Sequence, residues 1–476
     1  METAKASIAK PKAIKRIVKA SKVSTDSDFF KASRGYRFYP KLGCHLTNSG
    51  STSTNSLILK NPSFLTITVH SKMSETYKAD FPSEKIREGK VELLVPKLSA
   101  YGVVPSDYAP SRAPVFYNPV MEFNRDISVL TFKAYQRMVN REISICEPLT
   151  SQGIRGIRYA AEIEGIKNVL LSDINSHAYE LANHNIEQNN LRDKVTLEHK
   201  DANCVLSCNA SPKKRFDIID IDPFGTPVPY LDAAFRALKN KGLLAATATD
   251  LAPLCGVHAK ACVRKYGGKP LRTEYCHELA IRLMAGCMAY IAAKHDIGIQ
   301  ILLSHSSDHY IRVYAQIAYG AKKADESLKT TSYILHCFNC LHREIAQKPF
   351  GCPTCPECGT QMEHAGPLWI GSIADKAFVE EVLKENQAST FKNHTKIAKL
   401  LLTIKAEAKA PITYYVLDKI SKKLNLPAPS TQAFLTALRS NGFQAVTTHF
   451  NSRGIKTDAP ALAMQKTLEK LVSSKQ

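Results

Sequence analysis

Long hydrophobic runs are missing from this chain of 476 residues. No apolar stretch approaches the ~18–20 residues that a membrane-spanning helix needs, so we expect a soluble protein with no membrane partner. Acidic residues are also few, because 43 Asp and Glu stand against 64 Lys and Arg and leave a net charge of +21. A basic balance of this size favours polyanionic partners such as nucleic acid. The length is sufficient for two or three domains.

Acid is especially scarce at the N-terminus, where residues 1–72 contain 13 Lys and Arg but only 3 Asp and Glu. The segment opens with KPKAIKRIVKASK and continues into the Ser-rich TNSGSTSTNS. This composition is typical of a mitochondrial presequence, or of a nuclear basic signal in a disordered tail. We therefore expect a targeting or disordered leader. Met73 could begin a shorter form, and two start sites could give two compartments, the mitochondrion and the nucleus or cytoplasm.

Cysteine occurs thirteen times, but its pattern does not indicate a disulfide framework. The count is odd, and eight of the thiols are scattered along the chain, most of them among apolar neighbours. We expect these eight to be reduced packing residues in an intracellular protein. They are Cys44, Cys146, Cys204, Cys208, Cys255, Cys262, Cys276 and Cys287.

The other five cysteines lie close together in the sequence. Cys337 and Cys340 form one C-x2-C pair and Cys355 and Cys358 form another, with 14 residues between the pairs. This spacing is typical of a tetrahedral structural zinc site. Cys352 lies three residues before Cys355, so the second pair could instead be Cys352 and Cys355. The Cys-Pro-x-Cys-Gly form of a zinc knuckle favours Cys355 and Cys358.

The stretch DIIDIDPFGTPVPY, residues 217–230, organises the middle of the chain. Its β-branched apolar run predicts a buried central strand of a parallel sheet, which stops at Asp222-Pro223-Phe224. Open α/β sheets bind ligands outside the carboxyl ends of their strands. There a carboxylate and a prolyl carbonyl can accept hydrogen bonds from an amino group, and a phenyl ring offers a stacking face. The three residues could therefore bind a flat, amine-bearing base; an acidic strand end followed by a proline turn is the simpler alternative.

An alternation of strands and helices surrounds this stretch. The strand over 143–149 leads to a turn in which Gly153 and Gly156 permit close backbone approach at the start of a helix. The next strand ends at Asp173, twenty residues beyond Gly153. A strand-end acid at this spacing binds the ribose hydroxyls of an adenosine-containing cofactor. Asp201 closes a third strand and could accept a hydrogen bond from an adenine amino group.

Asp250 also stands at the carboxyl end of a predicted strand. With Asp173, Asp201 and Asp222 it completes a series of four acids that follow successive strands. Packing alone does not account for such a series. Upstream, Asn124-Arg125-Asp126 precedes a helical pattern that reaches about Val139. Read by itself, Arg125 is expected to be a surface salt-bridge partner.

The apolar runs IGIQILLSH and YIRVYAQIAY fit the sixth and seventh strands of a seven-stranded sheet, the seventh antiparallel. His277 and Glu278, on the helix before them, are expected to be ordinary structural residues. Beyond the cysteines, TYYVLDKISKKLNL and STQAFLTALRSNG predict two amphipathic helices around a Pro-x-Pro turn, followed by the strand QAVTTHF. This order resembles a winged helix, commonly a nucleic-acid surface. The basic residues that could contact phosphates there, or form a solvated charged face, are Lys422, Lys423, Arg439, Arg453 and Lys456.

Taken together, these motifs resemble the tRNA (guanine(26)-N(2))-dimethyltransferase family of eukaryotes and archaea. The resemblance spans roughly Phe81 to Pro460 and rests on VFYNPVMEFNRD, EPLTSQGIRGIRYAAEI, LSDIN, DPFGTPVPYLDAA, ATATDLAPLCG, KYGGKPLRTEYCHE, the cysteine cluster with GPLWIGSI, and HFNSRGIKTDAP. It implies an α/β fold: a Rossmann-like class I methyltransferase domain over residues 73–322, which uses S-adenosylmethionine. It also implies a smaller α+β domain over residues 323–476, with a zinc knuckle, that helps to hold tRNA.

The resemblance further implies a set of cofactor-binding residues. From the methionine end of the cofactor through its ribose to its adenine, they are Arg125, Arg155, Asp173, Asp201 and the backbone of Ala202. One stretch, Thr150-Ser151-Gln152, departs from the smaller residues that many relatives have before Gly153. It leaves the path of that loop open.

The implied reaction is an in-line displacement, in which the guanine 2-amino nitrogen attacks the sulfonium methyl group. Asp222 and the Pro223 carbonyl would hold the amino group, Asp222 could take its proton, and Phe224 would stack on the flipped base. The alternatives are an adenine amino-methyltransferase and a catalytically inactive tRNA-binding or chaperone protein. The C-terminal motifs argue against the first alternative, and the intact strand-end acids argue against the second. The expected partner is tRNA, and no obligate protein partner is evident.

Overall fold

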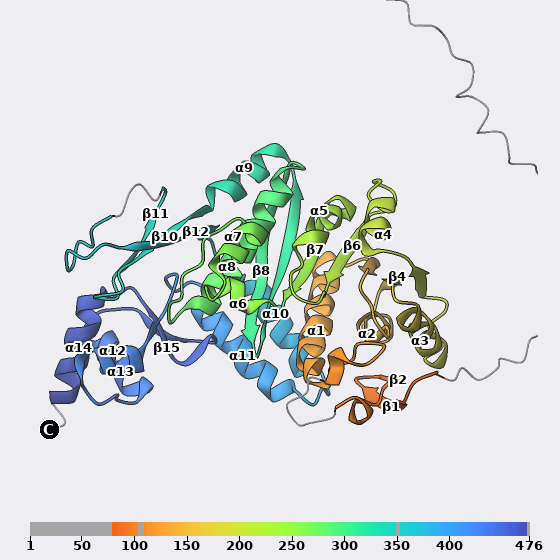
Figure 1. The fold of residues 1–476 in the computed structure, drawn as a ribbon, viewed down its shortest axis with the longest axis horizontal. Helices are drawn as coiled ribbons and strands as arrows, with labels where there is room; N and C mark the ends of the chain where they lie inside the picture. The colour runs from red at the N-terminus through yellow and green to blue at the C-terminus, as the bar shows by residue number, and fades with distance from the viewer. Residues whose placement is uncertain (1–78, 103–108, 349–352, 474–476) are drawn as a thin grey trace, which may run out of the picture. The chain divides into compact units, whose positions relative to one another are not determined.

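A sheet of seven strands lies at the centre of the part of the chain that the computed structural model describes, residues 79–102, 109–348 and 353–473 (Figure 1). The strand order is β5-β4-β3-β6-β7-β9-β8, and within this sheet β9 runs antiparallel to both of its neighbours. The predicted Rossmann-like sheet is therefore confirmed. Its strands are β3 (Ile143–Glu147), β4 (Ile166–Asp173), β5 (Val195–His199), β6 (Phe216–Ile221), β7 (Leu238–Ala248), β8 (Ile297–Ser307) and β9 (Tyr310–Tyr319).

Helices cover both faces of this sheet. Every residue of β3 and of β6 is buried, and a strand with two buried faces needs a nearly continuous apolar run instead of alternation. The helices that share a core with one face are α1 (Glu122–Val139), α2 (Ile154–Glu162) and α3 (Ser176–Gln188). Those on the other face are α4 (Ala202–Cys208), α5 (Val228–Ala237) and α8 (Cys276–Ala293).

A hairpin precedes the sheet, formed by β1 (Ser83–Glu88) and β2 (Val91–Pro96). Two side-chain amides hold β2 in place, one on α3 and one directly after its last residue. Asn185 exchanges hydrogen bonds with the backbone of Leu94, and Asn189 does so with the backbone of Glu92. Short helical elements connect the larger ones. They are η1 (Leu98–Ala100), η2 (Ala109–Ser111), η3 (Pro119–Met121), α6 (Leu251–Leu254) and α7 (Ala259–Tyr266).

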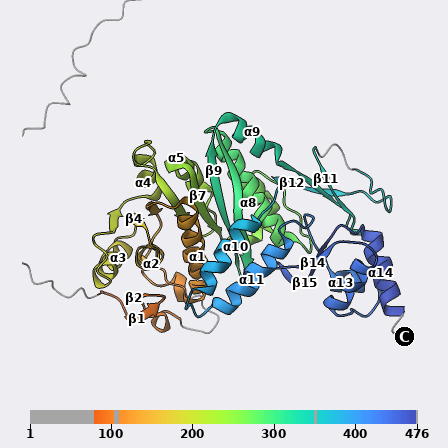
Figure 2. The same ribbon diagram turned by 180° about the vertical axis from the view of Figure 1, so that it is seen from behind.

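The chain beyond β9 packs back against the sheet layers. After α9 (Ala321–Lys329), a three-stranded sheet of order β11-β10-β12 lies on α8, where Gly286 leaves room for the backbone of Leu368. Helices α10 and α11 then share the core of α1, and Figure 2 shows them beside it. The bounds are β10 (Thr331–His336), β11 (Arg343–Ala346), β12 (Glu363–Trp369), α10 (Lys376–Gln387) and α11 (His394–Glu407).

The last part of the chain has its own core and a second three-stranded sheet, of order β13-β15-β14. The two predicted helices are present here, and the predicted strand that follows them corresponds to β14. The stretch predicted as the first helix begins instead with the short strand β13, since Tyr415 and Val416 pair with β15. The elements are β13 (Tyr415–Val416), α12 (Leu417–Leu424), α13 (Thr431–Ser440), β14 (Ala445–Thr448), β15 (Asn451–Thr457) and α14 (Ala461–Ser473).

Some sequence-based predictions lie outside the described residues: the leader over residues 1–72, the second start at Met73, and the alternative ligand Cys352. The domain boundary at 322/323 stays a prediction. Among the residues that are described, none of the helices combines the length and the apolar character that a bilayer span requires.

Candidate active site

The four acids predicted at strand ends all lie at one edge of the central sheet. Asp173 is the last residue of β4, Asp222 directly follows β6, and Asp201 and Asp250 come two residues after the ends of β5 and β7. Because these strands are parallel, their carboxyl ends meet at the same edge. This edge is therefore the candidate active site.

Asp222 makes a short, charged contact with Arg155 of α2. The Nε and Nη2 atoms of Arg155 lie 2.7 and 2.6 Å from Asp222 Oδ2, and an Arg312 guanidinium nitrogen lies 3.9 Å from Asp222 Oδ1. The Thr247 side chain is a further hydrogen-bond partner of the carboxylate. Burial on its own would raise the pKa of the Asp222 carboxyl, but Arg155 and Arg312 hold that pKa below its usual range. Asp222 is therefore a carboxylate at neutral pH, and the short contacts of Arg155 are to its Oδ2 atom.

A buried ionic network lies beneath Asp222. Arg312 of β9 donates to Asp220 at 2.6 Å and to Thr247 at 2.6 Å, and Tyr159 donates to the other oxygen of Asp220 at 2.6 Å. Asp220 and Arg312 are fully buried. Such paired groups hold a fixed arrangement, because breaking either pair would leave an unpaired buried charge. The sequence analysis gave Asp220 no role, although the spacing of Asp220 and Asp222 in DIIDID could have drawn attention to it, and nothing local identified Arg312.

The turn after Asp222 presents an aromatic ring to solvent. Phe224 is 70% exposed, and its ring meets that of Phe116 edge to face at 4.5 Å between centroids. Reciprocal hydrogen bonds fix the turn to the end of β7, because the Gly225 amide donates to Thr249 Oγ1 and the Thr249 amide donates to the Gly225 carbonyl. Pro223 is buried. Phe116 belongs to the VFYNPVMEFNRD motif, but no feature of its local sequence predicts this contact.

The loop before α2, whose path the sequence left open, is held by hydrogen bonds at each residue. Thr150 Oγ1 donates to Glu147, the Ser151 amide donates to Asp173, and the Gln152 carbonyl accepts from Asn185. The predicted close approach at Gly156 is confirmed, since a Cβ there would lie 2.1 Å from Leu171 Cδ2. Glu147 also accepts from the Gly156 amide at 2.8 Å, so it links the loop to α2.

The hydrogen bonds of the predicted cofactor acids, among the described residues, come from backbone amides. Asp173 accepts the backbone amides of Ser151 and Asn175, and Asp201 accepts the amide of Cys204 at the start of α4. Each carboxylate has further lone pairs for a ligand. Ile174, beside Asp173, is 70% exposed and offers an apolar surface at the same edge.

Asp250 differs from the other three acids. Its two oxygens accept from Tyr266 at 2.6 Å and from Lys265 at 2.9 Å, both in α7. Both oxygens of the Asp250 carboxylate are therefore engaged by α7, and its contacts are structural.

Buried polar atoms without a hydrogen-bond partner of good geometry occur at the same edge. They include Asn124 Nδ2 and Gln152 Oε1, on residues 0% and 2% exposed. The Tyr310 hydroxyl, at the start of β9, is a third, although the side chains of Ser307 and Asn124 are close enough to act as weak partners. Buried donors and acceptors are normally paired, so these atoms fit a site that receives a polar ligand.

Arg125 is not on the surface, which corrects the prediction made from its local sequence. It is 4% exposed, and its guanidinium donates twice to Glu88 of β1, at 2.7 and 2.6 Å. The helix starts earlier than predicted, since Asn118 caps the turn that runs from Pro119 into α1. Asn124-Arg125-Asp126 is therefore inside α1 and faces the buried side.

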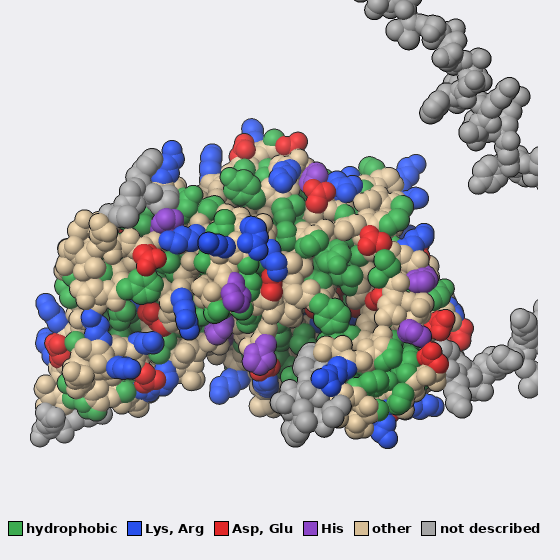
Figure 3. Space-filling view, in the orientation of Figure 1, with side chains coloured by type: hydrophobic (Ala, Val, Ile, Leu, Met, Phe, Trp, Pro, Cys, Tyr) green, Lys and Arg blue, Asp and Glu red, His purple; other side chains and the backbone are tan. Residues whose placement is uncertain are grey.

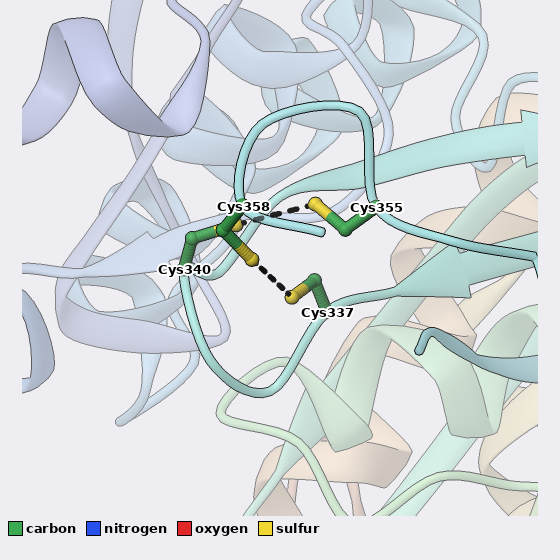
Figure 4. Close-up of side chains that lie close together, drawn as sticks. All are labelled: Cys337, Cys340, Cys355 and Cys358. Atoms are coloured by element: carbon green, nitrogen blue, oxygen red, sulfur yellow. Dashed lines mark hydrogen bonds between the residues drawn. The ribbon is translucent and has the colours of Figure 1, made fainter. Parts of the chain in front are cut away.

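Four thiols converge between two loops of the β10–β12 sheet (Figure 4). The Sγ atoms of Cys337, Cys340, Cys355 and Cys358 all lie within 4.8 Å of one another, so these residues are placed to hold a metal ion. Cys337 is 3.4 Å from Cys358, and Cys340 is 3.4 Å from Cys355. The cluster thus contains Cys355 and Cys358, the second pair that the Cys-Pro-x-Cys-Gly pattern favoured.

The chain matches the family model described as N2,N2-dimethylguanosine tRNA methyltransferase over residues 89–469. The chain belongs to this family. The family resemblance read from the motifs is therefore confirmed.

Relatives of this family cover most of the chain. A tRNA (guanine(26)-N(2))-dimethyltransferase of Methanobrevibacter smithii is 41% identical over 398 residues, which are 83% of this chain and 99% of the relative. One of Methanothermobacter thermautotrophicus is 41% identical over 376 residues, 79% and 95% of the two chains. The structure of Trm1 from Pyrococcus horikoshii with S-adenosyl-L-methionine aligns with a TM-score of 0.71 and 34% identity, over 81% of this chain and 99% of that one.

In a member of a tRNA methyltransferase family, exposed basic residues are candidate contacts to phosphates. The structure corrects the prediction that Lys456 is one of them. Lys456 is only 2% exposed, and its Nζ atom lies 2.9 Å from Glu278 and 3.9 Å from Glu407. It cannot contact phosphates, because β15 directs it into the buried side of the small sheet. Glu278 is fully buried between Lys456 and Arg282, so its predicted structural role is confirmed.

Proposed function

We propose that this protein transfers methyl groups from S-adenosylmethionine to the exocyclic 2-amino group of guanine at position 26 of tRNA, and that it forms the dimethylated base. The observation that supports this most directly is the ionised Asp222 beside the exposed ring of Phe224, at the ligand-binding edge of the sheet. Family membership and the names of the relatives support the same substrate and reaction.

The same edge of the sheet is the proposed cofactor site. S-adenosylmethionine supplies an electrophilic methyl group when it is bound. We propose that Arg125 and Arg155 bind its methionine end, Asp173 its ribose, and Asp201 with the Ala202 backbone its adenine. The buried polar atoms of Asn124, Gln152 and Tyr310, which lack a partner of good geometry among the described residues, support a polar ligand here, and exposed Ile174 supports an apolar contact to a base.

Asp222 orients the amino group of the guanine. The carboxylate accepts one N–H of the amine through Oδ1, and the Pro223 carbonyl accepts the other. The carboxylate takes the proton as the new N–C bond forms and the bond between the methyl carbon and the cofactor sulfur breaks. Phe224 stacks on the flipped base, and Phe116 supports Phe224 from the side. Positioning of this kind can account for roughly 7–11 kcal/mol of a barrier, which exceeds the few kcal/mol that unstacking the guanine costs.

The C-terminal elements would hold the tRNA. Lys422 and Lys423 of α12 are exposed, as is Arg439 of α13, although Arg439 also donates to the Ala445 carbonyl. Arg453 is half-buried and paired with Asp418. Lys and Arg side chains occur over this part of the molecule in Figure 3. Phosphate contacts from such residues are nonspecific in sequence and dependent on salt.

The four-thiol cluster would hold zinc. Four thiolates around one ion close the coordination sphere, so the role of this zinc is structural. We also propose that residues 1–72 direct the chain to the mitochondrion or the nucleus, on the basis of their basic, Ser-rich composition.

The reaction is tested by transfer of labelled methyl from S-adenosylmethionine to unmodified tRNA that has guanine or adenine at position 26. We expect label in dimethylguanosine, lost with Asp222→Ala and with the adenine tRNA. Asp232→Ala is the matched control, since Asp232 is an exposed acid of α5 paired with Arg236. Robust tRNA binding without any transfer would show instead a tRNA-binding relative without catalysis.

A further inference from the structure

Two cysteines and a histidine outside the active site converge at the start of α8. The Sγ atoms of Cys255 and Cys276 and one ring nitrogen of His277 all lie within 4.8 Å of one another. Cys255 directly follows α6, and Cys276 and His277 are the first two residues of α8. The proposed reaction and the four-thiol cluster use none of these side chains.

Close backbone packing brings the three residues together. Helix α6 packs against α8, and Gly256, next to Cys255, lies against the segment that leads into α8. A Cβ at Gly256 would lie 2.9 Å from the Arg272 amide nitrogen and 3.0 Å from the Leu271 carbonyl carbon, and its φ of +90° is itself one that glycine adopts readily. The position of Cys255 relative to Cys276 is therefore fixed by the fold and does not depend on a flexible loop.

The ligand atoms suit a thiophilic ion. Bond lengths of ~2.3 Å to sulfur and ~2.0 Å to nitrogen place the ligands of a tetrahedral zinc site roughly 3.5–3.8 Å apart. Atoms that already lie within 4.8 Å need only small side-chain rotations to reach this spacing. Cys276 and His277 are partly exposed, so an ion can enter from solvent.

We propose that Cys255, Cys276 and His277 form a second metal site, which binds a thiophilic divalent cation such as Zn²⁺ and leaves a fourth position to solvent. Two thiolates neutralise the ion, and the imidazole completes a Cys2His set, a ligand combination that zinc accepts. A disulfide between the two thiols would leave the imidazole without a role, and it would require an oxidising compartment. The ion would join the turn after β7 to the start of α8.

The zinc content of the full-length chain tests this proposal. The protein is loaded with Zn²⁺, freed of loosely bound ions by gel filtration, and analysed by inductively coupled plasma mass spectrometry. We expect two zinc ions per chain in the wild type, and one in Cys276→Ala, His277→Ala and Cys358→Ala. Cys287→Ala is the matched control, since Cys287 is a buried thiol on the same helix, and this variant should keep both ions.

One zinc ion per chain that is lost in Cys358→Ala and kept in Cys276→Ala would overturn the second site. One zinc ion per chain that is lost in Cys276→Ala and kept in Cys358→Ala would support the second site and would argue against zinc in the four-thiol cluster. Alkylation of the wild type with iodoacetamide gives an independent readout if a variant does not fold. Zinc should slow the labelling of Cys255 and Cys276 at least tenfold, whereas a Cys255–Cys276 disulfide in the non-reduced peptide map would contradict the proposal.

Discussion

Arg155 controls the charge state of Asp222, and this contact gives a prediction on pH dependence. Because the Arg155 guanidinium lies 2.6 Å from Asp222 and helps to hold its pKa below the usual range, Arg155→Met should raise that pKa. The carboxylate would then gain its proton at a higher pH, so the acid limb of the pH–rate profile should move to higher pH. Single-turnover methyl transfer at saturating S-adenosylmethionine measures the shift separately from cofactor binding.

Two controls accompany this variant. Arg155→Lys keeps a positive charge and should show a smaller shift. Arg137→Met removes an exposed arginine that pairs with Glu385 and should leave the profile unchanged. An unchanged acid limb in Arg155→Met would show that Asp222 is not the group whose ionisation limits the rate.

Phe224 and Phe116 give a second prediction at the level of single residues. Stacking of a base on an aromatic ring is worth about 1–3 kcal/mol, so Phe224→Leu should lower kcat/KM for tRNA by about 5- to 150-fold. Phe224→Tyr retains the ring and should stay close to the wild type. Phe116→Leu should have a smaller effect, because Phe116 acts by holding the Phe224 ring in place. Equal activity of the leucine and tyrosine variants at position 224 would contradict stacking.

At the scale of elements, the sequence predicted what depends on local pattern. Unbroken apolar runs identified the strands of the sheet, and each Asp at a strand end was placed correctly because chain direction in a parallel sheet decides it. The residues that were misplaced, Arg125 and Lys456, have partners far away in sequence, Glu88 and Glu278. No local pattern contains such a pairing. Arg312 was missed for the same reason, since its partner Asp220 lies two strands away.

The loops that hold the four thiols give a prediction at this scale. Gln465 of α14 donates to the Cys340 carbonyl, and Leu341 packs against the core that α12, α13 and α14 share. Removal of zinc should therefore loosen the C-terminal elements first, because a structural zinc site contributes folding free energy directly.

Chelation by EDTA is expected to weaken tRNA binding and to leave the affinity for S-adenosylmethionine within about twofold, as isothermal titration of both ligands would show. Readdition of Zn²⁺ should restore tRNA binding, and Cys358→Ala should weaken tRNA binding to the same extent as chelation does. A parallel loss of cofactor affinity would indicate instead that the metal supports the whole fold.

For the whole molecule, the contact between β15 and α8 matters most, because it joins the C-terminal elements to the sheet that contains the active site. Burial on its own would raise the pKa of Glu278, yet Lys456 and Arg282 lower it to about 2. Glu278 also accepts the Thr413 amide just before β13, and Lys456 lies near Glu407 of α11. The two regions are thus joined through fully paired buried charges, and removal of one partner leaves the other unpaired.

Lys456→Met should therefore destabilise the protein by about 3–5 kcal/mol in chemical denaturation, the usual cost of breaking a buried ion pair from one side. Because the pKa of Glu278 is lowered in the folded protein, the contribution of Glu278 to the free energy of unfolding is fully present above about pH 4.5. This contribution is lost as the pH falls towards 2. The difference in stability between the wild type and Lys456→Met should shrink over that window.

Lys422→Ala, which removes an exposed lysine of α12, should instead leave stability unchanged, weaken tRNA binding and reduce its salt dependence by about one phosphate contact. If Lys456→Met lost tRNA affinity at full stability, Lys456 would be a phosphate contact after all.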